Sequence, residues 1–239
     1  MPGNNMQVLY RKINLITGED MIKGVIFDID GVILDSMPVW DKAGEMFLLN
    51  LGIQPEEGLA ETLFCMSMSE GAKYLKERYR LDMNEDEIIN GVNETIKDFY
   101  AHQVQLKEGV DQFLSGIRQH GIKIVAATSC DRPVFERALE RLNVIRYFDR
   151  IFTSTEIGAG KVKPDIYIAA AEHMGTLPDE TWVFEDALYA IKTVKNAGFK
   201  TVGVYDDSSK ADWEEIKKIS DLYFIKLDDV YTFLEKVST

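Results

Sequence analysis

The chain has 239 residues, and 40 acidic against 27 basic side chains give it a formal net charge of −13 at pH 7. This charge argues against nucleic acids and anionic membranes as partners, because the sequence has no basic patch to neutralise their phosphates. No apolar run approaches the ~20 residues of a membrane span, and the distant cysteines Cys65 and Cys130 are expected to be packing residues. We therefore expect a soluble, cytoplasmic protein.

The first clear element is a strand at Lys23 to Asp28. Residues 1–20, which precede it, are polar and irregular and are expected to form an N-terminal extension, with Met21 as an alternative start. The continuous apolar run within the strand is typical of a strand buried on both faces of a parallel sheet. Asp28 and Asp30 stand at its carboxyl end, where parallel sheets bind ligands, so a metal or a phosphate is expected to use these charges. The alternative is an ordinary Asp-Gly turn.

The stretch 37–103 breaks the pattern of strands. It carries several helix signatures, among them a capping box at Ser67-Met68-Ser69-Glu70, and no convincing strand. We predict an inserted α-helical domain over 37–103, called the insertion below, between two parts of one core, 21–36 and 104–239. Four methionines are expected either to line an adaptable apolar pocket between insertion and core or to fill the interior: Met37, Met46, Met66 and Met68.

Strands and amphipathic helices alternate after the insertion. The predicted strands are Ile122–Ser129, Arg150–Thr153, Thr181–Asp186, Thr201–Tyr205 and Leu222–Ile225. Helical patterns with apolar residues three and four positions apart fill most of the gaps. This alternation predicts a Rossmann-like α/β core, in which helices cover both faces of a parallel sheet.

Two small hydroxyl side chains, Thr128 and Ser129, end the first of these strands. They are expected at the same sheet edge as Asp28, where hydroxyls and backbone N–H groups can hold phosphoryl oxygens. The alternative is that one of them or Asp131 only caps the next helix.

Two lysines, Lys161 and Lys163, stand before the helix that begins near Pro164-Asp165. One ammonium can pair with Asp28 and with a bound phosphate. The plainer interpretation is a solvent-exposed lysine, although the helix dipole disfavours a cation at this position.

The strand Thr181–Asp186 ends in a second acidic pair, Glu185 and Asp186. If the strand ends converge, these carboxylates and those after the first strand repel one another strongly. A hard divalent cation resolves the repulsion, and Mg²⁺ prefers carboxylates, waters and substrate phosphate. An exposed acidic loop is the alternative.

Together and in this order, the motifs resemble those of the haloacid dehalogenase superfamily over nearly everything after residue 21. The motif Asp28-Ile29-Asp30-Gly31-Val32 is similar to the form found in the phosphatases and phosphomutases of the family. The insertion is similar to the α-helical cap of the β-phosphoglucomutase-like subgroup. The resemblance implies that Asp28 is the nucleophile that takes the phosphoryl group and that Asp30 protonates the leaving group and later activates water.

The same resemblance implies how phosphate is held. Thr128 and Ser129 would bind it, and Lys161 would stabilise charge on it and on Asp28. Lys161 is favoured over Lys163 because it lies four residues before Asp165, as the family pattern requires.

The resemblance also implies a Mg²⁺ site. Its ligands would be the Asp28 carboxylate, the Asp30 backbone carbonyl and Asp186, with Glu185 binding through water or orienting the other ligands. One departure concerns Trp40, which occupies a position where β-phosphoglucomutases have histidine. Trp40 is expected to anchor its helix or to pack on the substrate, and its presence argues against mutase activity.

These expectations combine into one activity. The chain is expected to be a Mg²⁺-dependent phosphatase of small phosphorylated metabolites, sugar phosphates first, that works through a phospho-aspartate as a monomer or weak homodimer. The alternatives are a phosphomutase of the β-phosphoglucomutase type and a non-catalytic phosphate-binding or receiver-like protein.

Overall fold

The computed structural model describes residues 22–64 and 66–237, and its centre is a six-stranded parallel sheet in the order β3-β2-β1-β4-β5-β6. The strands are β1 (Gly24–Phe27), β2 (Lys123–Thr128), β3 (Arg150–Thr153), β4 (Thr181–Glu185), β5 (Lys200–Val204) and β6 (Leu222–Phe224). All six predicted strands are confirmed, and their ends differ from the prediction by one residue at most. The expected extension 1–20, Met21 and Cys65 lie outside the described residues.

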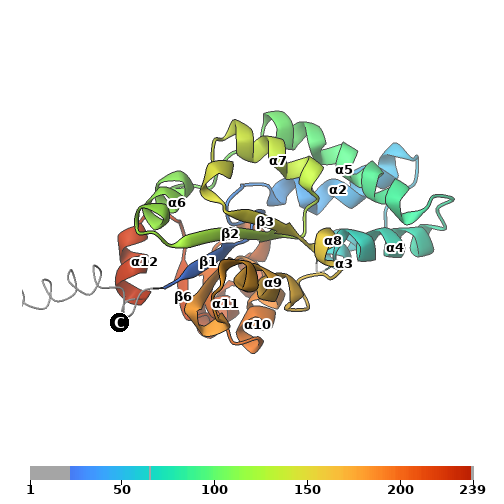
Figure 1. The fold of residues 1–239 in the computed structure, drawn as a ribbon. Helices are drawn as coiled ribbons and strands as arrows, with labels where there is room; N and C mark the ends of the chain where they lie inside the picture. Colours follow the sequence, from blue (N-terminus) through green and yellow to red (C-terminus); the bar gives the residue numbers. More distant parts are fainter. Residues whose placement is uncertain (1–21, 65, 238–239) are drawn as a thin grey trace, which may run out of the picture.

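Helices cover both faces of the sheet, so the predicted Rossmann-like class is confirmed (Figure 1). Those of the core are α6 (Val110–Gln119), α7 (Arg132–Arg141), α8 (Ser154–Ile157), α9 (Asp165–Met174), α10 (Leu188–Asn196), α11 (Trp213–Ile219) and α12 (Val230–Val237), with short 3₁₀ turns η1 (Ile145–Tyr147), η2 (Pro178–Glu180) and η3 (Asp207–Asp212). Alternate residues of a strand point to opposite faces. Phe27 therefore stacks on Phe184 and meets Phe113 of α6, whereas Ile26 packs in the cluster that includes Tyr167 of α9.

The insertion consists of α2 (Met37–Asn50), α3 (Leu59–Leu63), α4 (Met68–Tyr79) and α5 (Glu85–His102). None of its described residues belongs to a strand of the sheet, as the sequence predicted. The capping box is confirmed, because Ser67 Oγ accepts the N–H of Glu70 and the Glu70 carboxylate accepts the N–H of Ser67. In Figure 1 this helical segment lies at one end of the sheet, and α4 contacts α8, which directly follows β3.

The last helix of the insertion is attached to the core through α7. Arg141 Nη2 of α7 donates to the carbonyl oxygens of Val104 at 2.6 Å and Tyr100 at 3.2 Å. Asn93 Nδ2 of α5 donates to Asp131 Oδ2 at 3.0 Å. Asp131 stands at the N-cap of α7 without a side-chain capping bond. Its carboxylate links the two helices instead.

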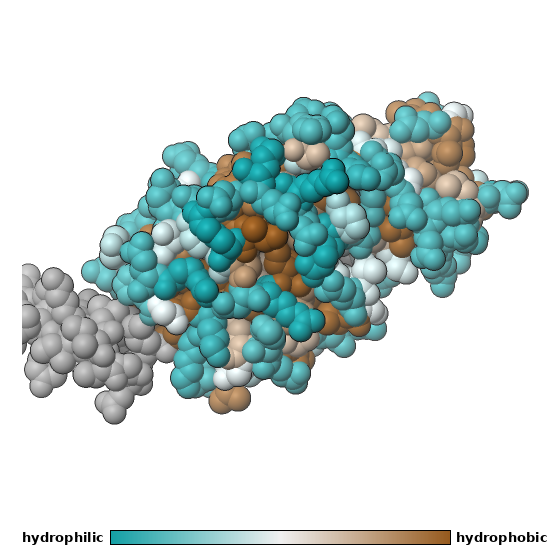
Figure 2. All heavy atoms as spheres, turned by 45° about the horizontal axis from the view of Figure 1, so that its top comes forward, coloured by the Kyte–Doolittle hydropathy of each residue, from teal (hydrophilic) through white to brown (hydrophobic). Residues whose placement is uncertain are grey.

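The face of the molecule in Figure 2 is largely hydrophilic, with hydrophobic residues showing near its centre and at its upper right end. None of the helices within the described ranges has the length and apolar character needed to cross a membrane.

Candidate active site

The centre of the site lies where β1 and β4 end side by side. Phe27 pairs with Phe184 in the parallel register, so the residues that follow, Asp28 and Glu185, are neighbours. Lys161 reaches between them, with its Nζ 2.5 Å from Asp28 Oδ1 and 2.8 Å from Glu185 Oε1. Only 3% of the Lys161 surface is exposed, whereas Lys163 is exposed to solvent. The structure therefore places Lys161, and not Lys163, beside Asp28.

Asp28, Glu185 and Asp186 form a buried acidic cluster in which one ligand oxygen from each residue lies within 4.8 Å of the others. Glu185 Oε2 and Asp186 Oδ2 are buried and have no hydrogen-bond partner among the described residues. Buried carboxylate oxygens without partners are costly, and oxygen donors are those that Mg²⁺ prefers. The donor set thus fits a hard divalent cation.

Gly31 allows the first acidic loop to approach the second. Its φ of 78° lies in the left-handed region, and a Cβ there would stand 2.8 Å from Asp186 Cγ. Any side chain at this position would push the Asp186 carboxylate away from the cluster. The glycine after Asp30 is therefore required by both backbone conformation and space.

The cluster carries more negative than positive charge. Burial, followed by the charge of Glu185, raises the pKa of Asp28 to about 7, although Lys161 opposes the shift. Burial and the charges of Asp28 and Glu185 raise the pKa of Asp186 well above its usual value. Burial alone would lower the pKa of Lys161, but Asp28 and Glu185 raise it overall, so this side chain stays a cation. One lysine does not neutralise three carboxylates.

Asp30 has surroundings of its own, beside the acidic cluster. Ser36 Oγ donates to Asp30 Oδ1 at 2.6 Å, the Tyr100 hydroxyl donates to the same oxygen, and Thr128 Oγ1 lies 3.5 Å from Oδ2. Burial and the charge of Asp28 raise the pKa of Asp30, and the hydrogen bonds from Ser36 and Tyr100 oppose this shift. A raised pKa keeps the carboxyl protonated closer to neutral pH, as a general acid requires.

The two predicted phosphate-binding hydroxyls lie at the end of β2 but in different surroundings. Thr128 is fully buried, and its Oγ1 accepts the N–H of Cys130 at 2.9 Å. Ser129 is half-buried, lines the cavity beside Asp28 and has its Oγ 3.4 Å from Ser154 Oγ. Cys130 is buried, which confirms it as a packing residue, and burial raises the pKa of its thiol.

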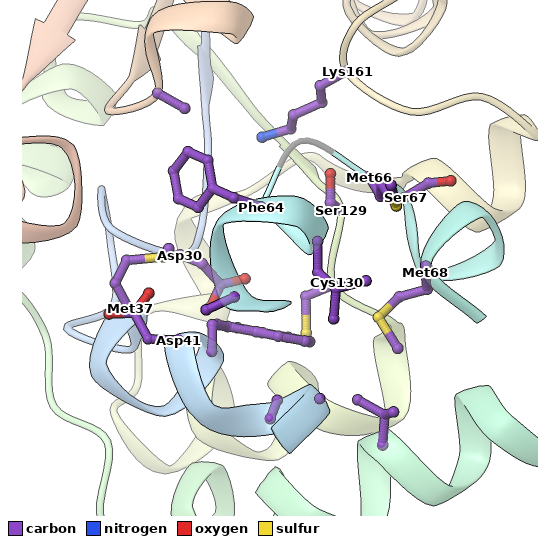
Figure 3. Close-up of a pocket in the computed structure, with 18 of the residues that line it drawn as sticks. Asp30, Met37, Asp41, Phe64, Met66, Ser67, Met68, Ser129, Cys130 and Lys161 are labelled. Carbon is purple, nitrogen blue, oxygen red and sulfur yellow. The ribbon is translucent and has the colours of Figure 1, made fainter. Parts of the chain in front are cut away.

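A cavity of about 160 Å³ lies between the insertion and the acidic residues (Figure 3). Its lining from the insertion is mainly apolar and includes Met37, Met66 and Met68, three of the four methionines expected either here or in the interior. Met46 is instead 37% exposed on α2. Ser129 and Lys161 line the cavity from the core side, so a molecule held in it would touch both parts of the chain.

Three tyrosines around the site were not identified from the sequence. Tyr167 donates to Glu185 Oε1 at 2.7 Å, Tyr189 lines the cavity, and Tyr100 bonds Asp30. Tyr167 and Tyr189 follow the lysine and acidic motifs closely, and a search for polar residues in the first turns of α9 and α10 would have found them. Tyr100 lies 70 residues after Asp30 and carries no local signal.

A parallel sheet with buried carboxylates and a paired lysine at the ends of its central strands is the architecture of an α/β enzyme. Comparison with known proteins shows the family. Residues 25–204 match the family model described as haloacid dehalogenase-like hydrolase, and the chain belongs to this family. The predicted resemblance and the predicted enzyme class, a phosphoric monoester hydrolase, are confirmed.

Three similar proteins illustrate the range of the family. The phosphorylated carbohydrates phosphatase of Thermotoga maritima is 27% identical over 218 residues, which cover 90% of this chain and 100% of that protein. The β-phosphoglucomutase of Bacillus subtilis is 28% identical over 191 residues, which cover 77% of this chain and 83% of that protein. The crystal structure of a protein described as a putative β-phosphoglucomutase from Thermotoga maritima superposes with a TM-score of 0.65 at 26% identity, covering 90% of this chain and 99% of that one.

Proposed function

We propose that this hydrolase is a Mg²⁺-dependent phosphatase of small phosphate monoesters, acting through a covalent phosphate on Asp28. The observation that carries the proposal is the contact of Asp28 with Lys161 inside a buried acidic cluster. The relative named as a phosphatase of phosphorylated carbohydrates makes sugar phosphates the first substrates to test.

In the first step, the Asp28 carboxylate attacks phosphorus and the bond from phosphorus to the leaving oxygen breaks. Asp30 gives its proton to that oxygen, so an alcohol leaves and Asp30 becomes a carboxylate. In the second step, Asp30 takes a proton from water, the water oxygen attacks phosphorus, and Asp28 is released with inorganic phosphate. Lys161, Thr128 and Ser129 hold the phosphoryl oxygens, and the insertion, acting as a cap, excludes bulk water.

The metal would be held by the carboxylates of Asp28 and Asp186 and the backbone carbonyl of Asp30, with Glu185 orienting a bound water. When bound, Mg²⁺ would reduce the repulsion between the Asp28 carboxylate and the phosphate dianion. Glu185 already accepts hydrogen bonds from Lys161 and Tyr167 through one oxygen, so its other oxygen is available for this role.

The experiment is phosphate release from a panel of sugar, nucleotide and small-acid phosphates with Mg²⁺, beside samples with EDTA. We expect turnover that disappears with EDTA. A folded protein that releases no phosphate from any ester would contradict the proposal and leave a mutase or a non-catalytic phosphate-binding protein.

A phosphomutase is the second candidate, because one similar protein is a β-phosphoglucomutase. A mutase returns the phosphoryl group to a sugar and releases little free phosphate. Trp40, where histidine is typical of the mutases, supports the phosphatase. Incubation with hexose 1-phosphate and a trace of hexose bisphosphate separates the two, since only a mutase accumulates hexose 6-phosphate.

The raised pKa of Asp28 predicts that Mg²⁺ stabilises the fold more at high pH than at low pH. A carboxyl whose pKa rises from 3.8 to about 7 on folding binds more protons in the native state, so without metal the stability falls as the pH rises through that interval. At higher pH a cation has fewer protons to displace. Thermal unfolding should show Mg²⁺ raising Tm by several degrees at about pH 8 and little at about pH 5. An equal rise at both pH values would contradict the prediction.

A further inference from the structure

We propose that Tyr100 and Trp40 are positioning residues that fix the orientation of Asp30. This inference rests on the proposed role of Asp30 as general acid and base. The Tyr100 hydroxyl donates to Asp30 Oδ1, and Trp40 Nε1 donates to the Tyr100 oxygen at 2.5 Å. Tyr100 lies near the end of α5 and Trp40 in the first turn of α2, so the two ends of the insertion meet at the side chain of Asp30.

The chemistry of the indole and hydroxyl groups decides which of them donates and which accepts in these hydrogen bonds. An indole N–H is a donor only, whereas a tyrosine hydroxyl has one hydrogen and two lone pairs. The Tyr100 oxygen must therefore accept from Trp40, and its single hydrogen is directed to Asp30. Removing the indole N–H would release the hydroxyl to rotate toward other acceptors.

These hydrogen bonds also distinguish the two carboxylate oxygens of Asp30. Ser36 and Tyr100 both donate to Oδ1, which is therefore an acceptor in this arrangement. Among the residues that the structure describes, the hydroxyl of Thr128 is the only hydrogen-bond partner of Oδ2, at the long distance of 3.5 Å. Oδ2 is left to carry the proton that passes to the leaving oxygen. Positioning of a proton donor is worth a large part of general acid catalysis, because the donor must stand within hydrogen-bond reach of the leaving atom.

Tyr100, at the inner end of this series of hydrogen bonds, is held by the core although it belongs to the insertion. Tyr100 is fully buried, its carbonyl accepts from Arg141 of α7, and its ring meets that of Trp40 edge-on at 6.4 Å. The outer end is different, because Trp40 is half-buried and lines the cavity. A molecule bound there touches Trp40 directly, so binding and the orientation of Asp30 are linked through two hydrogen bonds.

The test compares two esters of nearly equal shape, phenyl phosphate and p-nitrophenyl phosphate. The p-nitrophenolate ion leaves without help from an acid, whereas phenolate is more basic and needs the proton of Asp30. We expect Tyr100→Phe to lower kcat/KM about tenfold for phenyl phosphate and less than about threefold for p-nitrophenyl phosphate. Trp40→Phe should change this ratio in the same direction by a smaller factor. Adding Trp40→Phe to Tyr100→Phe should change it no further, since Trp40 acts through the missing hydroxyl.

Tyr147→Phe is the matched control, because it removes a hydroxyl that donates to Asp111 at 3.0 Å in the core. It should leave the ratio of the two esters unchanged. Asp30→Asn separates this proposal from the proposed function. If Asp30→Asn hydrolyses phenyl phosphate normally, Asp30 is not the acid and the proposed mechanism fails. If Asp30→Asn is impaired but Tyr100→Phe keeps the wild-type ratio, the positioning proposal alone is wrong.

Crystal structures of the wild type and of Tyr100→Phe provide a readout that does not depend on either ester. We expect the Asp30 carboxylate to leave its wild-type rotamer, or to occupy two rotamers, when the Tyr100 hydroxyl is absent. An Asp30 side chain that stays in place, still bound by Ser36, would overturn the inference even if neither aryl ester is a substrate.

Discussion

Asp28→Asn is expected to reduce kcat by more than about 10³-fold without lowering stability, because it removes the nucleophile and keeps the shape of the side chain. The pKa of Asp28 is raised to about 7, which means that the fold favours the neutral form of this side chain. An asparagine imitates that form and relieves repulsion from Glu185 and Asp186. Phosphate release and thermal unfolding in EDTA, measured on the same preparations, check both halves of the prediction.

Asp179→Asn is the control for this experiment. Asp179 is exposed in η2, which precedes β4 and so lies at the opposite edge of the sheet. Its substitution removes the same charge and should leave both kcat and Tm near the wild-type values. Full activity in Asp28→Asn would rule out a covalent intermediate on this residue.

Lys161→Met is expected to lower kcat/KM by about 10²-fold or more, which corresponds to about 2.7 kcal/mol of transition-state stabilisation. Methionine retains most of the length of the side chain but leaves the carboxylates of Asp28 and Glu185 without their cation. Breaking a buried ion pair from one side costs about 3–5 kcal/mol, so the metal-free variant should also unfold at a lower temperature. Steady-state kinetics and unfolding with and without Mg²⁺ measure the two effects.

Lys163→Met is the matched control, two residues away and exposed to solvent. Its kcat/KM should stay within about twofold of the wild type, since exposed charges contribute little. A loss of activity in Lys163→Met but not in Lys161→Met would contradict this prediction. It would mean that the loop carrying both lysines rearranges during the reaction, so that the geometry described above is not the catalytic one. Partial recovery of Tm of Lys161→Met by Mg²⁺ would show that the variant still folds around its acidic cluster.

The sheet could be predicted almost completely from the sequence. Each strand is a short apolar run between helical patterns, and a parallel strand buried on both faces leaves little ambiguity about its position. The convergence of Asp28 with Glu185 and Asp186 also followed, because polar residues after neighbouring parallel strands meet at one edge. The prediction could not choose between the lysines without the family pattern, since both stand before α9 at similar distances in the sequence.

The surroundings of Asp30 could not be predicted. Tyr100 is an ordinary aromatic residue within the apolar face of α5, and its pattern is that of a core residue. Its hydroxyl reaches Asp30 because α5 packs against α7 of the core, where Arg141 and Asp131 bond Tyr100 and Asn93. Such contacts depend on how helices pack against one another, and the periodicity of a single helix contains no information about its partner. The role of Trp40 was open for the same reason, and its indole both lines the cavity and bonds Tyr100.

The central claim is that a phosphoryl group passes through Asp28, and peptide mass spectrometry of acid-quenched enzyme tests it most directly. The enzyme would be mixed with its best ester and Mg²⁺, quenched during turnover and digested. The account predicts the added mass of one phosphoryl group on the peptide that contains Asp28, and its absence with EDTA and in Asp28→Asn. Turnover that leaves this peptide unmodified, with the phosphoryl group on another residue, would contradict the account.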